Sequence, residues 1–258
     1  MIGFHLVTDL DGTWIPDPAH VEHLRRLEAA IRSHPENVLT FATGRTFGSA
    51  TDLMARWGLA APDHLITDVV CALWHRQSNG AFEEDLAYAT VVAERCSRED
   101  ADRLVSEGLP RSVQGQVGVS PTRRLALEAV EGVPLDQASR DLWRALLSCG
   151  MNAEILPSHG RYLDVLPTGV DKGFAVIYLQ RSAGLPRPLV CCGDSANDLG
   201  MLRKADFPVL MGDGLIDFDA PGLPRERTYR TPHGGPVGIH EALLSFALLE
   251  AMEVKDEH

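Results

Sequence analysis

The sequence predicts an α/β fold in which parallel strands alternate with helices, interrupted by a smaller α+β unit. Short apolar runs alternate with segments whose apolar residues recur at helical spacing. Between roughly 74 and 166 this pattern gives way to hairpin strands with helices grouped between them, and the alternation then resumes. We therefore expect a core formed by residues 1–73 and 168–258, and an inserted unit formed by residues 74–167.

The elements before the insertion follow the order strand, helix, strand, helix, strand. The spacing of Val21, Leu24, Leu27 and Ile31 predicts the first helix, and Leu53, Met54 and Trp57 share one face of the second. This order requires right-handed crossovers within a parallel sheet. The expected strands are 2–7, 37–41 and 64–67, and the first helix covers about 18–33.

The insertion and the second part of the core are predicted in the same way. In the insertion we expect helices at 83–96, 98–107 and 135–149 and strands at 124–130, 151–156 and 162–166, the last two flanking a polar turn at 158–161. After it we expect a helix at 171–183, a strand at 189–192, a short helix through Leu199 and Leu202, a strand at 207–211 and a closing helix at 237–253.

Composition excludes several classes of function. The 258 residues carry a formal net charge of −12, which argues against nucleic acid or an anionic membrane as partner. No segment approaches the ~20 consecutive apolar residues of a membrane span, and no signal peptide is seen. The five cysteines show no metal-ligand spacing. We therefore expect a cytoplasmic protein, a monomer or homodimer, with a small-molecule substrate.

Polar residues follow the predicted parallel strands. Asp9 and Asp11 come after the first strand, and Gly12 allows the chain to turn sharply there. Since the carboxyl ends of parallel strands meet at one edge, these carboxylates should lie near the other loops at that edge. Such an oxygen-rich set suits Mg²⁺; a structural Ca²⁺ site is the alternative, but it leaves Thr43, Gly44 and Lys172 unexplained. The other loops carry Thr43-Gly44-Arg45, Lys172, and Asp194, Asn197 and Asp198.

Four short motifs in this order resemble those of haloacid-dehalogenase (HAD) superfamily phosphatases, which have a Rossmann-like core. They are Asp9-Leu10-Asp11-Gly12-Thr13, Thr43-Gly44, Lys172 within Asp171-Lys172-Gly173, and Gly193-Asp194-Ser195-Ala196-Asn197-Asp198. The insertion resembles the larger α+β cap of that superfamily. Within the superfamily, the chain is most similar to sucrose-phosphate phosphatases and related sugar-phosphate phosphatases. This similarity rests on Thr8 to Trp14, Thr43-Gly44-Arg45 and Asp164-Val165-Leu166-Pro167.

The resemblance implies a mechanism and a role for each motif. Asp9 would form an aspartyl-phosphate, Asp11 would act as general acid and base, and Lys172 would stabilise the phosphate. The Mg²⁺ residues would be Asp9, Asp11 through its backbone carbonyl, Asp194 and Asp198, with Asp198 and Asn197 acting on metal waters or on Lys172. Thr43, Gly44, Arg45 and Gly12 would contact phosphate or substrate, and His159 and Arg161 of the polar turn would contact the sugar.

Each role has a plainer alternative. Thr43 would cap the following helix, Arg45 would form a surface ion pair, and Lys172 would be an exposed first-turn residue. Asp198 would only complement a helix dipole, His159 would be an ordinary loop residue, and Trp14 would pack under the cap instead of serving as a sugar platform. For the whole protein, the alternatives are a phosphomutase of the α-phosphomannomutase type or a non-catalytic sugar-phosphate-binding protein.

One segment departs from the resemblance. After the third strand, the similar phosphatases carry a Gly-Thr or Asn-Gly type of turn, whereas this chain has Asp68-Val69-Val70-Cys71-Ala72. Losing the glycine changes how closely this loop can approach the phosphate. None of the four motifs lies in this segment, so the departure concerns sugar specificity and leaves the predicted chemistry intact.

Overall fold

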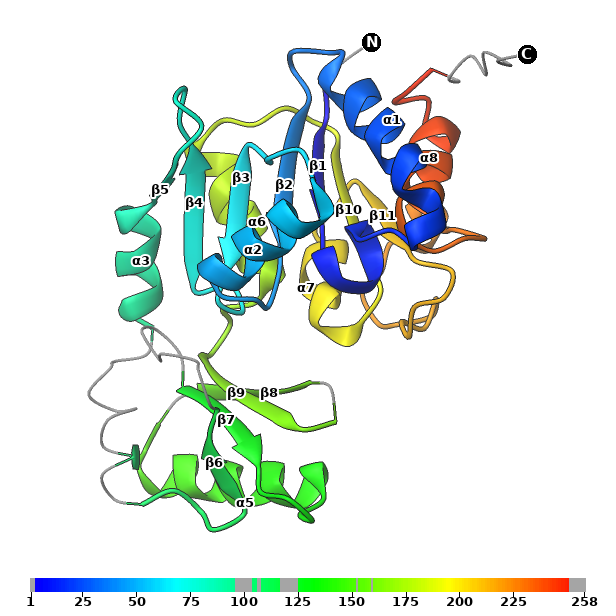
Figure 1. Ribbon diagram of the computed structural model, residues 1–258. Coiled ribbons are helices and arrows are strands. Elements are labelled where there is room, and N and C mark those ends of the chain that lie inside the picture. The colour runs from blue at the N-terminus through cyan, green and yellow to red at the C-terminus, as the bar shows by residue number, and fades with distance from the viewer. Residues whose placement is uncertain are drawn as a thin grey trace.

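The computed structural model describes residues 3–95, 104–105, 108–116, 125–151, 153–158 and 160–250. Its larger sheet has eight strands in the order β12-β11-β10-β1-β2-β3-β4-β5 (Figure 1). The first six strands in this order run parallel, and β4 and β5 continue the sheet antiparallel. The strands are β1 His5–Thr8, β2 Val38–Ala42, β3 His64–Thr67, β4 Ala72–Arg76, β5 Phe82–Glu84, β10 Leu189–Gly193, β11 Phe207–Leu210 and β12 Tyr229–Arg230.

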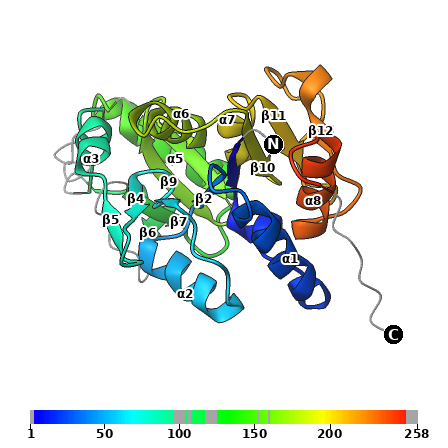
Figure 2. The same ribbon diagram turned by 90° about the horizontal axis from the view of Figure 1, so that it is seen from above.

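Helices cover both faces of this sheet. Figure 2 shows α1, α2 and α8 on one face and α6 and α7 on the other. Successive strand residues point to opposite faces, so Leu6 of β1 packs under the first group of helices and Val7 under the second. The helices are α1 Val21–Arg32, α2 Phe47–Trp57, α3 Leu86–Ala93, α6 Lys172–Ser182, α7 Leu199–Leu202 and α8 Gly235–Ser245. None of the described helices is long and apolar enough to cross a membrane.

The second sheet belongs to the inserted unit, and its four antiparallel strands have the order β6-β7-β9-β8. They are β6 Val113–Gly115, β7 Leu125–Ala129, β8 Ala153–Ser158 and β9 Tyr162–Pro167. Helix α5 Leu135–Ser148 packs Leu142 and Leu146 against one face through Leu127 and Leu163. In Figure 1 this helix lies on the side of the sheet away from the core, so the other face is turned toward the core.

The α/β class with a parallel sheet is confirmed, but several element predictions were wrong. The segments Ala72–Arg76 and Phe82–Glu84 form β4 and β5 of the large sheet, where we expected no strands and where the predicted insertion starts at 74. These strands are short and partly exposed, so they lack the continuous apolar run of a central strand. The helix expected at 83–96 is present as α3, which begins at Leu86. The closing helix ends at Ser245, and Ala247 has a φ of 55°, which no α-helix continues through. The expected helix at 98–107 falls almost entirely outside the described residues.

A histidine lies at the centre of the large sheet. His5 of β1 is fully buried, with Nδ1 2.7 Å from Gln180 Oε1 and Nε2 2.8 Å from Thr40 Oγ1. Burial lowers the pKa of His5 to about 4, against the opposing effect of the Gln180 hydrogen bond. The folded chain therefore holds this imidazole neutral at pH values where the unfolded chain protonates it.

We expect the fold to lose stability as the pH falls from about 6.5 toward 4. The unfolded chain then binds a proton at His5 that the folded chain does not, which costs about 2 kcal/mol between pH 7 and pH 5. Urea unfolding at both pH values measures this. His5→Asn should remove this part of the pH dependence, whereas His20→Asn, at an exposed position, should keep it. Equal pH dependence in His5→Asn and the unaltered chain would contradict the assignment.

Candidate active site

The first motif forms a tight turn at the end of β1. The Asp9 amide donates to the Cys192 carbonyl at 3.1 Å, so Asp9 continues the line of the sheet before the chain turns at Leu10–Trp14. Gly12 has a φ of 76°, and a Cβ placed on it would lie 2.7 Å from Asp194 Oδ2. Only glycine fits both the left-handed backbone and this close approach. The turn thereby brings the first and fourth motifs together.

Lys172, the first residue of α6, is buried between two carboxylates. Its Nζ lies 2.7 Å from Asp9 Oδ1 and 2.6 Å from Asp198 Oδ1. Helices α6 and α7 approach closely here, since a Cβ on Gly173 would lie 2.3 Å from the Gly200 carbonyl oxygen. The glycine beside Lys172 therefore permits the helix contact that places the ammonium group at the sheet edge.

Asp198 uses both carboxylate oxygens within the chain. Oδ1 accepts from Lys172, and Oδ2 accepts from the backbone amides of Asp194 and Ser195, both at 3.1 Å. This side chain is fully buried. These contacts position Lys172 and fix the turn that carries Asp194. The Asn197 Oδ1 accepts from the Ser195 hydroxyl at 2.6 Å, so Asn197 also steadies this turn.

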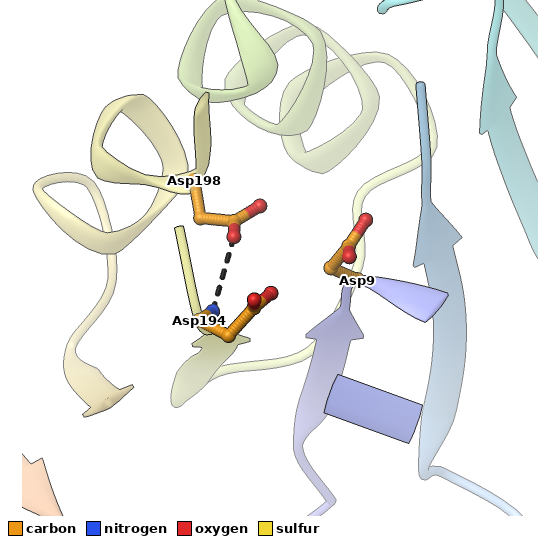
Figure 3. A group of neighbouring side chains, drawn as sticks. All are labelled: Asp9, Asp194 and Asp198. Carbon is orange, nitrogen blue, oxygen red and sulfur yellow. Dashed lines mark hydrogen bonds between the residues drawn. The ribbon is translucent and has the colours of Figure 1, made fainter. Parts of the chain in front are cut away.

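Three carboxylates gather at this edge. One oxygen each of Asp9, Asp194 and Asp198 lies within 4.8 Å of the others, and Figure 3 shows the three groups around one space at the ends of β1 and β10. The Thr13 hydroxyl donates to Asp194 Oδ1 at 3.1 Å and orients that group. With Lys172, three carboxylates leave two negative charges uncompensated. The donor set therefore fits a divalent cation that prefers oxygen ligands, such as Mg²⁺.

The charges at this edge also affect protonation. Burial raises the pKa of Asp9 well above its usual range, with Lys172 opposing and Asp198 adding to the effect. Burial, followed by the charge of Asp198, raises the pKa of Asp194. Although burial alone would lower the pKa of Lys172, the charges of Asp198 and Asp9 together hold it above the ordinary value. Lys172 is thus cationic, and a bound cation would favour the ionised form of Asp9.

The second motif lies beside Asp11. The Thr43 amide donates to the Ile66 carbonyl at 2.9 Å, and the Thr43 hydroxyl accepts from the Arg45 amide at 3.2 Å. The Arg45 guanidinium binds Asp11 through two bonds, Nε to Oδ2 at 2.7 Å and Nη2 to Oδ1 at 2.8 Å. Such a paired geometry fixes the carboxylate in one orientation. The Asp11 side chain therefore lies on Arg45 and outside the group of three carboxylates.

Several of the plainer alternatives can now be assessed. Thr46, not Thr43, is the N-cap of α2, because its side chain accepts from the Ser49 amide. The Lys172 side chain is only 3% exposed, so it is not a surface residue. Trp14 is fully buried with its ring 5.4 Å from that of Phe41, so it is a packing residue, although it packs within the core and not under the cap.

The polar turn of the insertion joins a cluster on the sheet face opposite α5. Arg161 Nη2 and Gln114 Nε2 donate to the same oxygen of Glu128, at 2.9 and 2.8 Å. The Arg161 side chain is 60% exposed, whereas that of Glu128 is 5% exposed. Arg161 and Gln114 are therefore the groups that this cluster presents outward. His159 lies outside the described residues.

Sequence reasoning missed the roles of Thr13 and Ser195 and the partner of Arg45. Thr13 and Ser195 lie within the first and fourth motifs, so their positions in the sequence could have indicated a role in the site. The contact between Arg45 and Asp11 joins residues 34 positions apart on different loops, and no sequence pattern indicates it.

Comparison with known proteins identifies the family. The sequence profile of sucrose-6F-phosphate phosphohydrolase matches residues 3–246. The chain belongs to this family. It is therefore a member of the HAD superfamily of the sucrose-phosphatase type, as the motifs predicted.

Three relatives are similar over almost the whole chain. The chain is 31% identical to a glucosylglycerol-phosphate synthase from Pseudomonas anguilliseptica over 95% of its length, although it spans only 31% of that protein. It is 26% identical to a mannosylfructose-phosphate phosphatase from Agrobacterium fabrum, covering 94% of this chain and 96% of the relative. The sucrose-phosphatase from Synechocystis sp. PCC6803, solved with sucrose and phosphate, superposes with a TM-score of 0.76 at 26% identity, covering 96% of this chain and 99% of that one.

Removing the Lys172 ammonium should destabilise the fold strongly. Lys172→Met leaves the two buried carboxylates of Asp9 and Asp198 without their shared cation, and loss of one partner of a buried pair costs about 3–5 kcal/mol. Urea unfolding at pH 7.5 measures the loss. Lys204→Met is the matched control, because Lys204 is exposed and follows α7 in the chain, and it should change stability little. Similar stabilities for the two variants would show that the Lys172 contacts contribute little to the fold.

Proposed function

We propose that this protein is a Mg²⁺-dependent phosphatase that hydrolyses a sugar phosphate through an aspartyl-phosphate at Asp9. The observation that carries the proposal is the contact of Lys172 Nζ with Asp9 Oδ1 at 2.7 Å, beside Asp194 and at the carboxyl edge of the parallel sheet. A cation fixed against a buried carboxylate suits a nucleophile that must approach an anionic phosphate. The phosphatase names of similar proteins favour hydrolysis over the phosphomutase and non-catalytic alternatives.

The nucleophile and the groups around it have distinct tasks. One Asp9 oxygen is held by Lys172, so the other oxygen is available to attack phosphorus in line and displace the sugar oxygen. The ammonium of Lys172 then stabilises the negative charge on the transferring phosphoryl group. Asp198 keeps that ammonium in place from the opposite side. The Thr43 hydroxyl and the Gly44 amide would bind the remaining phosphate oxygens.

Asp11 would serve as the general acid and base. It would protonate the departing sugar oxygen and later remove a proton from the water that hydrolyses the aspartyl-phosphate; such assistance is typically worth ~10²–10⁴-fold in rate. Arg45 engages both oxygens of the Asp11 carboxylate and is itself held by the Ser49 hydroxyl at 3.0 Å, so Asp11 would have to release Arg45 from one oxygen before that oxygen carries a proton. Both groups are partly exposed, at 35% and 45%, so a substrate can reach them.

Mg²⁺ would be held by Asp9 and Asp194, with the backbone carbonyl of Asp11 as a further ligand. When bound, it supplies Lewis-acid polarisation of a phosphate oxygen and offsets repulsion between the nucleophile and the substrate. Asp198 contributes to the negative field of the site, but both its oxygens are already engaged by Lys172 and by backbone amides. We therefore propose it as a positioning residue and no longer as a direct ligand.

Two features support the proposed substrate class, namely the insertion and the similarity to known phosphatases. We propose the insertion as a cap whose polar sheet face meets the sugar when the cap closes over the site. Arg161 and Gln114 present hydrogen-bond donors on this face, which suit the hydroxyl groups of a sugar. The names of two similar proteins, the glucosylglycerol-phosphate synthase and the mannosylfructose-phosphate phosphatase, each contain a phosphorylated glycoside. A sucrose 6-phosphate-like disaccharide phosphate or a hexose phosphate is therefore the expected substrate.

We expect the protein to release inorganic phosphate from one or two sugar phosphates, and only with Mg²⁺. The panel should contain sucrose 6-phosphate, mannosylfructose phosphate, glucosylglycerol phosphate, trehalose 6-phosphate and glucose 6-phosphate. Asp9→Asn should abolish release because an amide cannot attack phosphorus. Since it keeps the shape of the side chain, it should remain folded by circular dichroism. Absence of release from every member, or unchanged release by Asp9→Asn, would contradict the proposal.

Arg161→Ala should weaken sugar binding without affecting the phosphoryl chemistry. Loss of a charged hydrogen-bond donor should raise KM for the best sugar phosphate by roughly 10-fold or more, while kcat/KM for p-nitrophenyl phosphate stays within a factor of two. Steady-state kinetics on both substrates measure the difference. The control is Arg140→Ala, which removes an exposed arginine from α5, on the opposite side of the cap sheet. If both substrates respond equally, Arg161 does not read the sugar.

A further inference from the structure

The segment that departs from the family pattern adopts an uncommon backbone. Asp68, Val69 and Val70 follow one another with φ values of 56°, 50° and 73°. This left-handed conformation is disfavoured for residues with a Cβ and most of all for β-branched ones. A turn of this kind persists only where its surroundings hold it.

A tyrosine from α3 holds the turn from inside the protein. The Tyr88 hydroxyl donates to the Val70 carbonyl at 2.6 Å, and Tyr88 is fully buried. Burial raises the pKa of Tyr88 above its ordinary value, so the hydroxyl stays protonated and able to donate. The Cys71 amide, which donates to the Asp68 carbonyl at 3.2 Å, closes the turn on its other side.

The turn lies directly against the second motif. The Asp68 amide donates to the Arg45 carbonyl at 2.7 Å. A Cβ built on Gly44 would lie 3.8 Å from Val69 Cγ2, so the Val69 side chain is a direct neighbour of Gly44. A shift of the turn would therefore move Gly44 and the backbone of Arg45.

Tyr88 also contacts the helix that begins with Lys172. Its ring lies 4.9 Å from that of Tyr178 and 6.1 Å from that of Phe174, both on α6. One buried side chain thus touches the turn that supports Gly44 and the helix that carries Lys172. These two elements would flank the phosphate from different sides.

We propose that Tyr88 is a positioning residue for phosphate binding, which acts by holding Asp68–Val70 in the left-handed turn that places Gly44 and Arg45. The inference rests on the proposed function, because it assumes that these loops bind a phosphate ester. Tyr88 itself does not touch the reacting atoms.

Tyr88→Phe removes the hydroxyl and keeps the ring. We expect KM for the best phosphate ester and the inhibition constant of inorganic phosphate to rise together by about tenfold, while kcat falls no more than about threefold. Loss of active protein alone would lower kcat and leave both binding constants unchanged. The matched control is Tyr178→Phe, which removes the hydroxyl of the neighbouring ring and should leave all three constants within a factor of two.

The double variant Tyr88→Phe/Val70→Gly separates positioning from packing. Glycine adopts the left-handed backbone without the tether, so we expect KM and the phosphate inhibition constant to return to within threefold of the unaltered protein. A packing role predicts the opposite, because the double variant also loses a buried valine side chain. If Tyr88→Phe alone does not fold, recovery of soluble, active protein in the double variant supports the proposal, and insoluble protein overturns it.

Two results would overturn the inference: unchanged binding constants in Tyr88→Phe, or a defect that Val70→Gly fails to restore.

Failure of the proposed function has a different signature, namely no turnover by the unaltered protein. In that case, calorimetric titration of inorganic phosphate with Mg²⁺ still tests Tyr88. Weaker phosphate binding in Tyr88→Phe that is restored in the double variant supports the inference, and equal binding in all three proteins overturns it.

Discussion

The structure depends on one buried ammonium group. The positive charge of Lys172 lies between the carboxylates of Asp9 and Asp198. Without it, these two buried carboxylates would repel each other, because no solvent screens their charges. A buried charge of this kind is tolerated only when its partners are placed accurately, since each unpaired ion costs several kcal/mol. The end of β1, the start of α6 and the turn after β10 must therefore converge. The glycines at the α6–α7 contact and at the first turn permit that convergence.

The arrangement that stabilises the fold also prepares the chemistry. The negative charge of the three carboxylates exceeds the charge that Lys172 can balance, and a bound divalent cation would balance the excess. Asp11 is kept apart from this group by Arg45, so the proposed general acid and the proposed nucleophile occupy different electrostatic environments. Separating two neighbouring carboxylates in this way lets one act as nucleophile while the other handles protons. In the proposed mechanism, the polar face of the second sheet would offer hydrogen-bond donors to the sugar.

The sequence predicted the parallel core and the meeting of the four motif loops, because strand order and the position of Asp9, Lys172 and Asp194 after strands or at helix starts constrain where they lie. It did not predict β4 and β5, whose partly exposed residues lack a clear apolar pattern. Contacts between loops distant in the chain, such as Arg45 with Asp11 and Tyr88 with Val70, depend on side-chain geometry that no periodicity records. Prediction therefore succeeded where backbone topology decides the outcome and failed where a single tertiary contact does.

The central claim is that Asp9, held by Lys172, becomes covalently phosphorylated during turnover. The most direct measurement is to quench the protein during hydrolysis of its best sugar phosphate, reduce it with borohydride, and analyse the peptide containing residue 9 by mass spectrometry. Reduction of an aspartyl-phosphate gives homoserine, so we expect homoserine at residue 9 and an unmodified Asp11. Continuous phosphate release with an unmodified Asp9, or homoserine at another carboxylate, would contradict the assignment of Asp9 as the nucleophile.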